Sequence, residues 1–237
     1  RVPLRVSTNA QDFSSTQVAF EFVACPPGAY CSHLQVLPCP WGAACNSRGG
    51  SNFTECVPGT YQSRTGRSSC APCPIGHYCP APGLPEPLIC PAGFVCSMEG
   101  LSYPNTPCPS GHFCPPGVES MDPITQRTER RPLECPENTW CPAGVADNVT
   151  MPGNMSTPQP CLAGFVCFRG SDSAMGSGPC PTGYYCPPNS LPIECSPGHY
   201  CSGVGNVFPA QCTPGYYNDK YGRNQCIECP IGFICPQ

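Results

Sequence analysis

The stretch CVPGTYQSRTGRSSCAPCPIGHYC at residues 56–79 contains two consecutive units that each open with the pattern Cys-x-x-Gly. The second unit has five residues between its two cysteines, and the same spacing recurs in CPPGAYC at 25–31, CPSGHFC at 108–114 and CPTGYYC at 180–186. A fixed pattern that returns along a chain is the mark of a repeat architecture. The sequence therefore predicts a tandem array of small cysteine modules.

All 24 cysteines fall into twelve such units, of which ten are short and two, at 56–70 and 212–226, are longer. In chain order they are Cys25 and Cys31, Cys39 and Cys45, Cys56 and Cys70, Cys73 and Cys79, Cys90 and Cys96, Cys108 and Cys114, Cys135 and Cys141, Cys161 and Cys167, Cys180 and Cys186, Cys195 and Cys201, Cys212 and Cys226, and Cys229 and Cys235. We expect every one of them in a disulfide, because an even number of closely spaced cysteines is typical of a covalent framework.

The third residue after each opening cysteine is glycine in eleven units and Asn138 in the twelfth. Glycine, and after it asparagine, tolerates a positive φ. Proline stands one or two places after the opening cysteine in eleven units and presets φ for a tight turn. An apolar residue usually precedes the closing cysteine of a short unit and is expected to pack against a neighbouring disulfide. We predict a small disulfide-rich fold of tandem modules with short β-hairpins and turns and almost no helix, stacked as an elongated rod.

The composition is typical of an extracellular protein. It holds 35 prolines and 25 glycines among 237 residues, and only 11% of its residues are charged, which an ordinary globular domain does not match. Two dozen cysteines indicate an oxidising compartment, so we expect a secreted or cell-surface protein. No run of about 18 apolar residues is present, so no membrane span is expected in this chain. The net charge is −4 and the basic residues are scattered, which argues against a nucleic-acid partner.

Four segments are predicted. Residues 1–24 form an extended β arm, residues 25–89 hold modules 1–4, and residues 90–179 hold modules 5–8 with two long loops. Residues 180–237 hold modules 9–12 and repeat the first block, since cysteines 39–79 recur at 195–235 with a constant shift of 156 residues. A duplication of module blocks explains this longer period.

Two disulfide connectivities fit the order of the cysteines. Either each unit closes on itself, or each closing cysteine pairs with the next opening one. The second scheme leaves Cys25 and Cys235 without partners and needs a bridge between Cys70 and Cys73, a loop too tight for relaxed disulfide geometry in most backbones. Self-closing units are favoured, and more distant pairings stay open.

The segments 56–79 and 212–235 resemble the ephrin-receptor-like and TNF-receptor-like cysteine-rich repeats. The resemblance implies that an opening cysteine in the pattern Cys-x-x-Gly-x-Tyr pairs with the next cysteine and that the modules stack into a rod. The short units are also similar to repetitive surface proteins of microbial eukaryotes, such as flagellar-hair subunits. Since the group includes receptors, adhesins and fibre proteins, the resemblance specifies architecture only.

The arm at residues 1–24 lacks cysteine and glycine. Its apolar residues alternate with the period of half-buried strands, at Val2, Leu4 and Val6 and again at Val18, Phe20 and Phe22. Such strands need an edge to join. In one interpretation they pair with each other or pack on the first modules of their own chain. In the other, the arm adds to the next subunit and builds a filament head to tail.

Three Asn-x-Ser/Thr triplets, at Asn52, Asn148 and Asn154, lie in predicted surface loops and predict N-linked glycans. Catalytic and metal chemistry is not expected. The Cys-x-x-Cys pairs at 70/73 and 226/229 match a zinc spacing, but each cysteine has a disulfide partner in the modular scheme. His77, His112 and His199 follow a module glycine, in a position that accepts any side chain. We expect no cofactor.

The predicted function is that of a structural subunit of an extracellular glycoprotein filament or surface layer, which assembles with copies of itself through its N-terminal strand. The alternative is a receptor or adhesin ectodomain that binds a protein or carbohydrate ligand. An enzyme is not expected, because no nucleophile motif and no separated histidine and aspartate of a hydrolytic triad can be placed.

Overall fold

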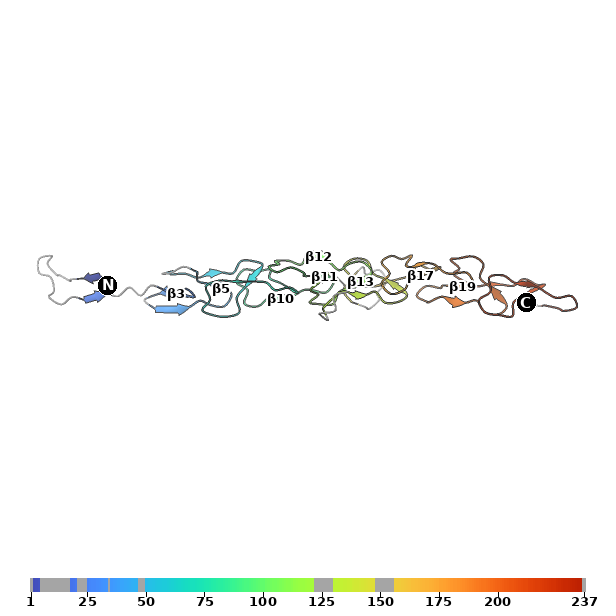
Figure 1. Cartoon of the computed structure of the whole chain (residues 1–237), viewed down its shortest axis with the longest axis horizontal. Helices are drawn as coiled ribbons and strands as arrows, with labels where there is room; N and C mark the ends of the chain where they lie inside the picture. The colour runs from blue at the N-terminus through green and yellow to red at the C-terminus, as the bar shows by residue number, and fades with distance from the viewer. Residues whose placement is uncertain are drawn as a thin grey trace. The chain divides into compact units, whose positions relative to one another are not determined.

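The computed structural model describes residues 2–4, 18–20, 25–33, 35–46, 50–121, 130–147 and 156–235. In these residues the regular structure consists of two-stranded antiparallel hairpins joined by turns, and they contain no helix (Figure 1). The predicted small disulfide-rich fold of tandem modules is therefore confirmed.

Contacts divide the chain into two compact units, one formed by Arg1–Pro72 and Cys79–Pro87 and the other by Cys73–Tyr78 and Leu88–Gln237. This division rests on contacts, whereas the module blocks at 25–89, 90–179 and 180–237 rest on the sequence period and stay a prediction.

The described residues of the first unit form eight strands. They are β1 (Val2–Leu4), β2 (Val18–Phe20), β3 (Ala29–Ser32), β4 (Gln35–Pro38), β5 (Ala43–Ala44), β6 (Thr54–Glu55), β7 (Thr60–Tyr61) and β8 (Ala71–Pro72). The second unit contains β9 (His77–Tyr78), β10 (Leu88–Ile89), β11 (Phe94–Val95), β12 (Thr106–Pro107), β13 (His112–Phe113), β14 (Leu133–Glu134), β15 (Thr139–Trp140), β16 (Gln159–Pro160), β17 (Phe165–Val166), β18 (Gly178–Pro179), β19 (Tyr184–Tyr185), β20 (Ile193–Glu194), β21 (His199–Tyr200), β22 (Ala210–Gln211), β23 (Tyr216–Tyr217) and β24 (Ile227–Glu228). Each odd-numbered strand pairs with the even-numbered strand that follows it.

The predicted turn is present in all twelve modules. The N–H of the fourth residue after the opening cysteine donates to the carbonyl of the first, with N···O distances of 3.0–3.3 Å. The third residue has a positive φ, between 72° and 88° at the eleven glycines and 67° at Asn138. This is the geometry of a type II β-turn, whose third residue requires a positive φ. One backbone requirement thus explains both the glycine rule and its exception.

The hairpins connect one module to the next. The two residues after the turn glycine pair with the two residues before the next opening cysteine, as in β7–β8, where Thr60 lies opposite Pro72. Most of these hairpins have strands of only two residues. Because an isolated two-stranded hairpin is marginally stable at best in water, the covalent staples and the neighbouring modules must hold it.

The disulfides close the modules on themselves, as one of the two predicted connectivities required. The bonded pairs are Cys39–Cys45, Cys56–Cys70, Cys90–Cys96, Cys108–Cys114, Cys135–Cys141, Cys161–Cys167, Cys180–Cys186, Cys195–Cys201, Cys212–Cys226 and Cys229–Cys235. Cys73 and Cys79 are disulfide-bonded as well. The sulfur atoms of Cys70 and Cys226 are therefore engaged and are not thiolate ligands for zinc.

The first module departs from this scheme. Cys25 and Cys31, which the sequence assigns to a disulfide, are free thiols in the structure. Cys25 is buried, and this desolvation, together with a hydrogen bond to Cys31 and the nearby charge of the Cys31 thiolate form, raises the pKa of Cys25 to about 11. The two thiols hydrogen-bond to each other, and burial of Cys25 favours its protonated form.

The core of the described residues consists of disulfides, four of which form clusters with buried or partly buried apolar residues. Val95, which precedes the closing cysteine of module 5, is fully buried against Cys108 and Cys114 of module 6. Phe113 of module 6 packs in the same way against Cys135 and Cys141 of module 7. The apolar residue of each of these modules thus covers the disulfide of the following one, as the sequence predicted. The core is thin, and cysteine supplies most of it.

Candidate functional site

The faces between consecutive modules are the most regular chemical feature of the described chain. At every one of the eleven steps, the third residue after the opening cysteine of a module donates its N–H to a carbonyl of the next module. The acceptor is the sixth residue after the opening cysteine of that next module. The N–H of Gly93, for example, lies 2.9 Å from the carbonyl oxygen of Cys114. The two long modules have Gln62 and Asn218 at the sixth position, and their carbonyls accept the bond from Gly42 and Gly198.

Gln62 and Asn218 replace a cysteine at this position and are buried, with 8% and 5% of their surface exposed. Their amides satisfy the surrounding backbone. The Gln62 side chain donates to the carbonyl of Ser69 and accepts from the N–H of Arg64, at 2.7 and 3.1 Å. The Asn218 side chain donates to the carbonyl of His199 and accepts from the N–H of Lys220. In the long modules, these side-chain hydrogen bonds therefore fix the backbone at the position that the closing cysteine occupies in the short modules.

A second set of left-handed glycines was not predicted. These residues follow the opening cysteine of their module by nine or ten positions and have φ between 68° and 83°, or 86° at Gly144. They are Gly66, Gly83, Gly100, Gly117, Gly144, Gly170, Gly205 and Gly222. The N–H of each donates to the carbonyl of the opening cysteine one module earlier, as from Gly144 to Cys108 at 2.9 Å. Their spacing of nine or ten residues from the opening cysteine is a signal that the sequence contains.

The two sets of glycines also contact each other, two modules apart. A Cβ atom added to Gly93 would lie 2.6 Å from the carbonyl oxygen of Gly144, and one added to Gly111 would lie 2.5 Å from that of Gly170. Both distances are shorter than real side chains allow. Gly93 and Gly111 are therefore required for close backbone approach as well as for φ, and each of these modules contacts both the next module and the one after it.

The predicted assembly arm lies only partly in the described residues. Val2, Leu4, Val18 and Phe20 lie on β1 and β2, which pair with each other, Val2 opposite Phe20 and Leu4 opposite Val18. This agrees with the first of the two interpretations, in which the two strands of the arm pair with each other. Val6 and Phe22, also assigned to the arm, lie outside the described residues. Pairing within the hairpin occupies one edge of each strand.

The predicted modification and histidine positions are spread over the surface. Asn52 and the other two residues of its triplet are exposed, just before and within β6. Asn148 and Asn154 lie outside the described residues. The rings of His77, His112 and His199 each have Nδ1 3.1–3.4 Å from the carbonyl oxygen two residues earlier. In the described part of the chain no three metal-ligating side chains gather at one point.

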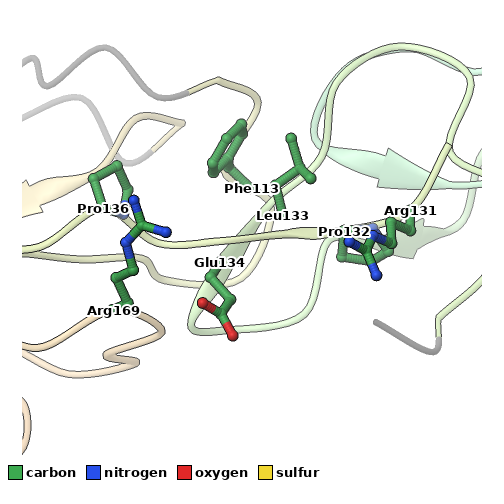
Figure 2. A pocket seen from close by; sticks show the side chains of 7 residues that line it. All are labelled: Phe113, Arg131, Pro132, Leu133, Glu134, Pro136 and Arg169. Atoms are coloured by element: carbon green, nitrogen blue, oxygen red, sulfur yellow. The ribbon is translucent and has the colours of Figure 1, made fainter. Parts of the chain in front are cut away.

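A cavity of about 520 Å³ is formed by residues of modules 6, 7 and 8, within the second unit. Phe113, Leu133 and Pro136 provide apolar walls, and Arg131, Glu134 and Arg169 provide charged groups. In Figure 2, Arg169 lies beside Pro136 at one end, Arg131 beside Pro132 at the other, and Glu134 between them. We refer to this cavity as the arginine pocket. Its volume falls within the range of small-molecule sites, about 300–1,000 Å³.

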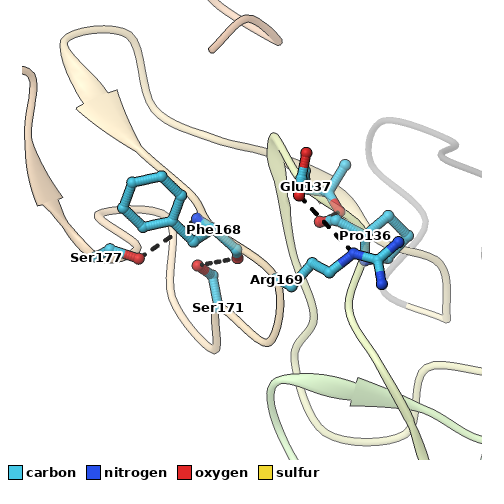
Figure 3. A network of polar contacts seen from close by, with 7 residues as sticks. Pro136, Glu137, Phe168, Arg169, Ser171 and Ser177 are labelled. Carbon is cyan, nitrogen blue, oxygen red and sulfur yellow. Dashed lines mark hydrogen bonds and ion pairs between the residues drawn. The ribbon is translucent and has the colours of Figure 1, made fainter. Parts of the chain in front are cut away.

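Arg169 is placed by a tight turn at residues 168–171. The N–H of Ser171 donates to the carbonyl of Phe168 at 3.2 Å, and the Ser171 hydroxyl donates to the same oxygen at 2.7 Å (Figure 3). Gly170 supplies the positive φ of this turn, and its N–H is anchored on the carbonyl of Cys135. The side chain of Arg169 reaches Glu137, with 3.8 Å between Nε and Oε1. The module framework thus fixes the backbone from which Arg169 projects.

One further polar pair lies on module 9. The hydroxyl of Tyr184 donates to Oε1 of Glu194 at 3.0 Å, across the β19–β20 hairpin. This hydrogen bond and the negative charge of the carboxylate raise the pKa of the Tyr184 phenol.

In the described residues no helix is long and apolar enough to cross a membrane. The repeated disulfides and hairpins are consistent with an extracellular structural or receptor-like protein. No model of a known protein family matches the chain, and no curated protein matches it either.

Proposed function

We propose that this chain is a structural subunit of an extracellular glycoprotein filament or surface layer that assembles with copies of itself, head to tail, through its N-terminal hairpin. The observation that supports this proposal is the unbroken series of backbone hydrogen bonds between successive modules, repeated at eleven steps. A repeat protein in which each module contacts chiefly its neighbours is suited to span distance and bear load. The likeness to ephrin-receptor-like and flagellar-hair repeats supports the modular architecture and does not choose between a fibre and a receptor.

The donor surface is the β1–β2 hairpin, because each of its strands has an outer edge that another strand can join. The acceptor is the corresponding edge of module 12 of a second copy. There Ile231, Phe233 and Ile234 are 103%, 74% and 93% exposed. In module 5 the residues equivalent to Phe233 and Ile234 are Phe94 and Val95, which lie in a hairpin and are at least half-buried.

Electron microscopy of the purified, oxidised chain tests this proposal. We expect filaments from the native chain, and only single particles after deletion of residues 1–24 or after Ile234→Lys. The matched control is Val204→Lys, which places the same charge at a site that is 64% exposed and outside the proposed contact; it should leave filaments intact. Filaments from the truncated chain would exclude the hairpin as the connector. A native chain that remains monomeric would favour the receptor or adhesin function.

A further inference from the structure

We propose that the arginine pocket binds an acidic saccharide, that is, a sugar that carries one carboxylate together with hydroxyl groups. This binding site lies on the side of the module array, within modules 6–8, and it does not depend on self-assembly. Its groups combine two cations, one anion and an apolar wall in a cavity of about 520 Å³.

Arg169 is the anion-binding group, and Arg131, at the other end of the pocket, is a donor to ligand hydroxyl groups. A guanidinium offers several N–H donors in a planar fork that matches the two oxygens of a carboxylate. Arg169 contacts Glu137 at 3.8 Å, and the two side chains are 72% and 51% exposed. A solvent-exposed pair of this kind contributes little to stability. The Arg169 guanidinium can therefore turn from Glu137 toward a ligand carboxylate at small cost.

Glu134 restricts which anions fit. It lies between the two arginines in Figure 2, and its backbone is held opposite His112 in the β13–β14 hairpin. A carboxylate accepts hydrogen bonds from hydroxyl or amide groups and repels a second concentrated negative charge. The pocket therefore disfavours phosphate esters and nucleic acids, in agreement with a net charge of −4. It favours a ligand in which hydroxyl groups stand next to a single carboxylate, as in a uronic acid.

The apolar wall suits the carbon face of a sugar ring. Phe113 is packed against Cys135, Cys141 and Val145, so its ring is held in place by a disulfide. Leu133 and Pro136 complete this side of the pocket. The apolar wall at Phe113 is thus held in place before a ligand arrives, and a preformed wall lowers the cost of ordering side chains on binding, whereas Arg169 is ordered only when it turns to the ligand.

Isothermal titration of the full oxidised chain with galacturonate, a uronide that carries one carboxylate, tests the site, with neutral galactose and the acidic peptide tetraglutamate as comparison ligands. We expect binding of the uronide only, and a dissociation constant that rises roughly tenfold or more in Arg169→Gln and in Arg131→Gln, as expected from the loss of a charge-assisted hydrogen bond. Arg64→Gln removes the same charge from an exposed side chain of another module and should bind like the native chain. Binding should also weaken when salt is raised from about 0.1 M to about 1 M.

Three results would overturn the proposal. They are absence of uronide binding at millimolar concentration, equal binding of the uronide by the Arg169→Gln and Arg64→Gln variants, and binding of tetraglutamate as tight as that of the uronide, which would assign the pocket to acidic peptides. Since all titrations read a binding step on single chains, their outcome is independent of whether filaments form.

Discussion

Alanine substitution of a turn glycine separates the two requirements that the fold places on this residue. Gly164 and Gly198 occupy the same position in modules of equal length and have φ of 82° and 80°. A Cβ atom at Gly164 would lie 2.7 Å from the carbonyl oxygen of Gly205, whereas one at Gly198 would meet nothing within 4 Å. Gly164→Ala therefore incurs both a conformational and a steric penalty, and Gly198→Ala incurs the conformational one alone.

The magnitudes follow from this difference. Forcing a non-glycine residue into the left-handed region costs about 1–2 kcal/mol, and overpacking a tight contact costs about 1–3 kcal/mol more. We expect Gly198→Ala to lower the local opening free energy by about 1–2 kcal/mol, and Gly164→Ala to lower it by about 2–5 kcal/mol. The extra steric part corresponds to roughly a 5- to 150-fold faster amide exchange.

Residue-resolved hydrogen exchange under oxidising conditions is the appropriate assay, because a chain of many stapled modules is not expected to unfold in a single two-state step. The reporters are the amide of Cys180, bonded to the Gly164 carbonyl at 2.7 Å, and that of Cys212, bonded to the Gly198 carbonyl at 2.9 Å. Equal acceleration at both amides would refute the close-approach argument and leave φ as the only requirement.

Three further outcomes are expected. In the reduced first module, Cys25 should alkylate at least tenfold more slowly than an ordinary thiol at pH 8, since its pKa is raised to about 11, and mild oxidation should remove both thiols as a Cys25–Cys31 disulfide, measured by mass spectrometry. The raised pKa of Tyr184 means that its pair with Glu194 stabilises the folded chain below pH 10 and that this contribution is lost as pH rises through the folded-state value; Glu194→Gln should lower the pKa in an ultraviolet titration. In a eukaryotic secretory host, Asn52→Gln should remove one glycan mass, and an unchanged mass would show that this exposed triplet is not used.

Much of the fold could be predicted because cysteine spacing and glycine position report local requirements. A type II turn needs a positive φ at its third residue wherever it occurs, so eleven glycines and Asn138 predict it without any tertiary information. The same local spacing favoured self-closing disulfides over the second connectivity, although it also assigned a bond to Cys25 and Cys31, which are free thiols. The arginine pocket could not be predicted in this way, because Phe113, Glu134 and Arg169 come from three separate segments and meet only when the modules stack. Scattered in the sequence, Arg131 and Arg169 gave no sign of a shared site.

Asn138 shows why the second glycine requirement escaped notice. Asn138 tolerates a positive φ and so fits the turn position. A positive φ alone is then enough to explain the eleven glycines at the same position. The counterpart of Asn138 two modules later is Asn189, with φ of 59°, at the position where modules 3–8, 10 and 11 have a glycine in the second turn. The hydrogen bond from Cys161 to the Asn138 carbonyl is 3.2 Å, against 2.7–3.0 Å for the equivalent bonds to glycine. The close approach at Gly93 and Gly111 depends on a second turn two modules away, so it is a property of residue pairs, which a rule read one module at a time does not reveal.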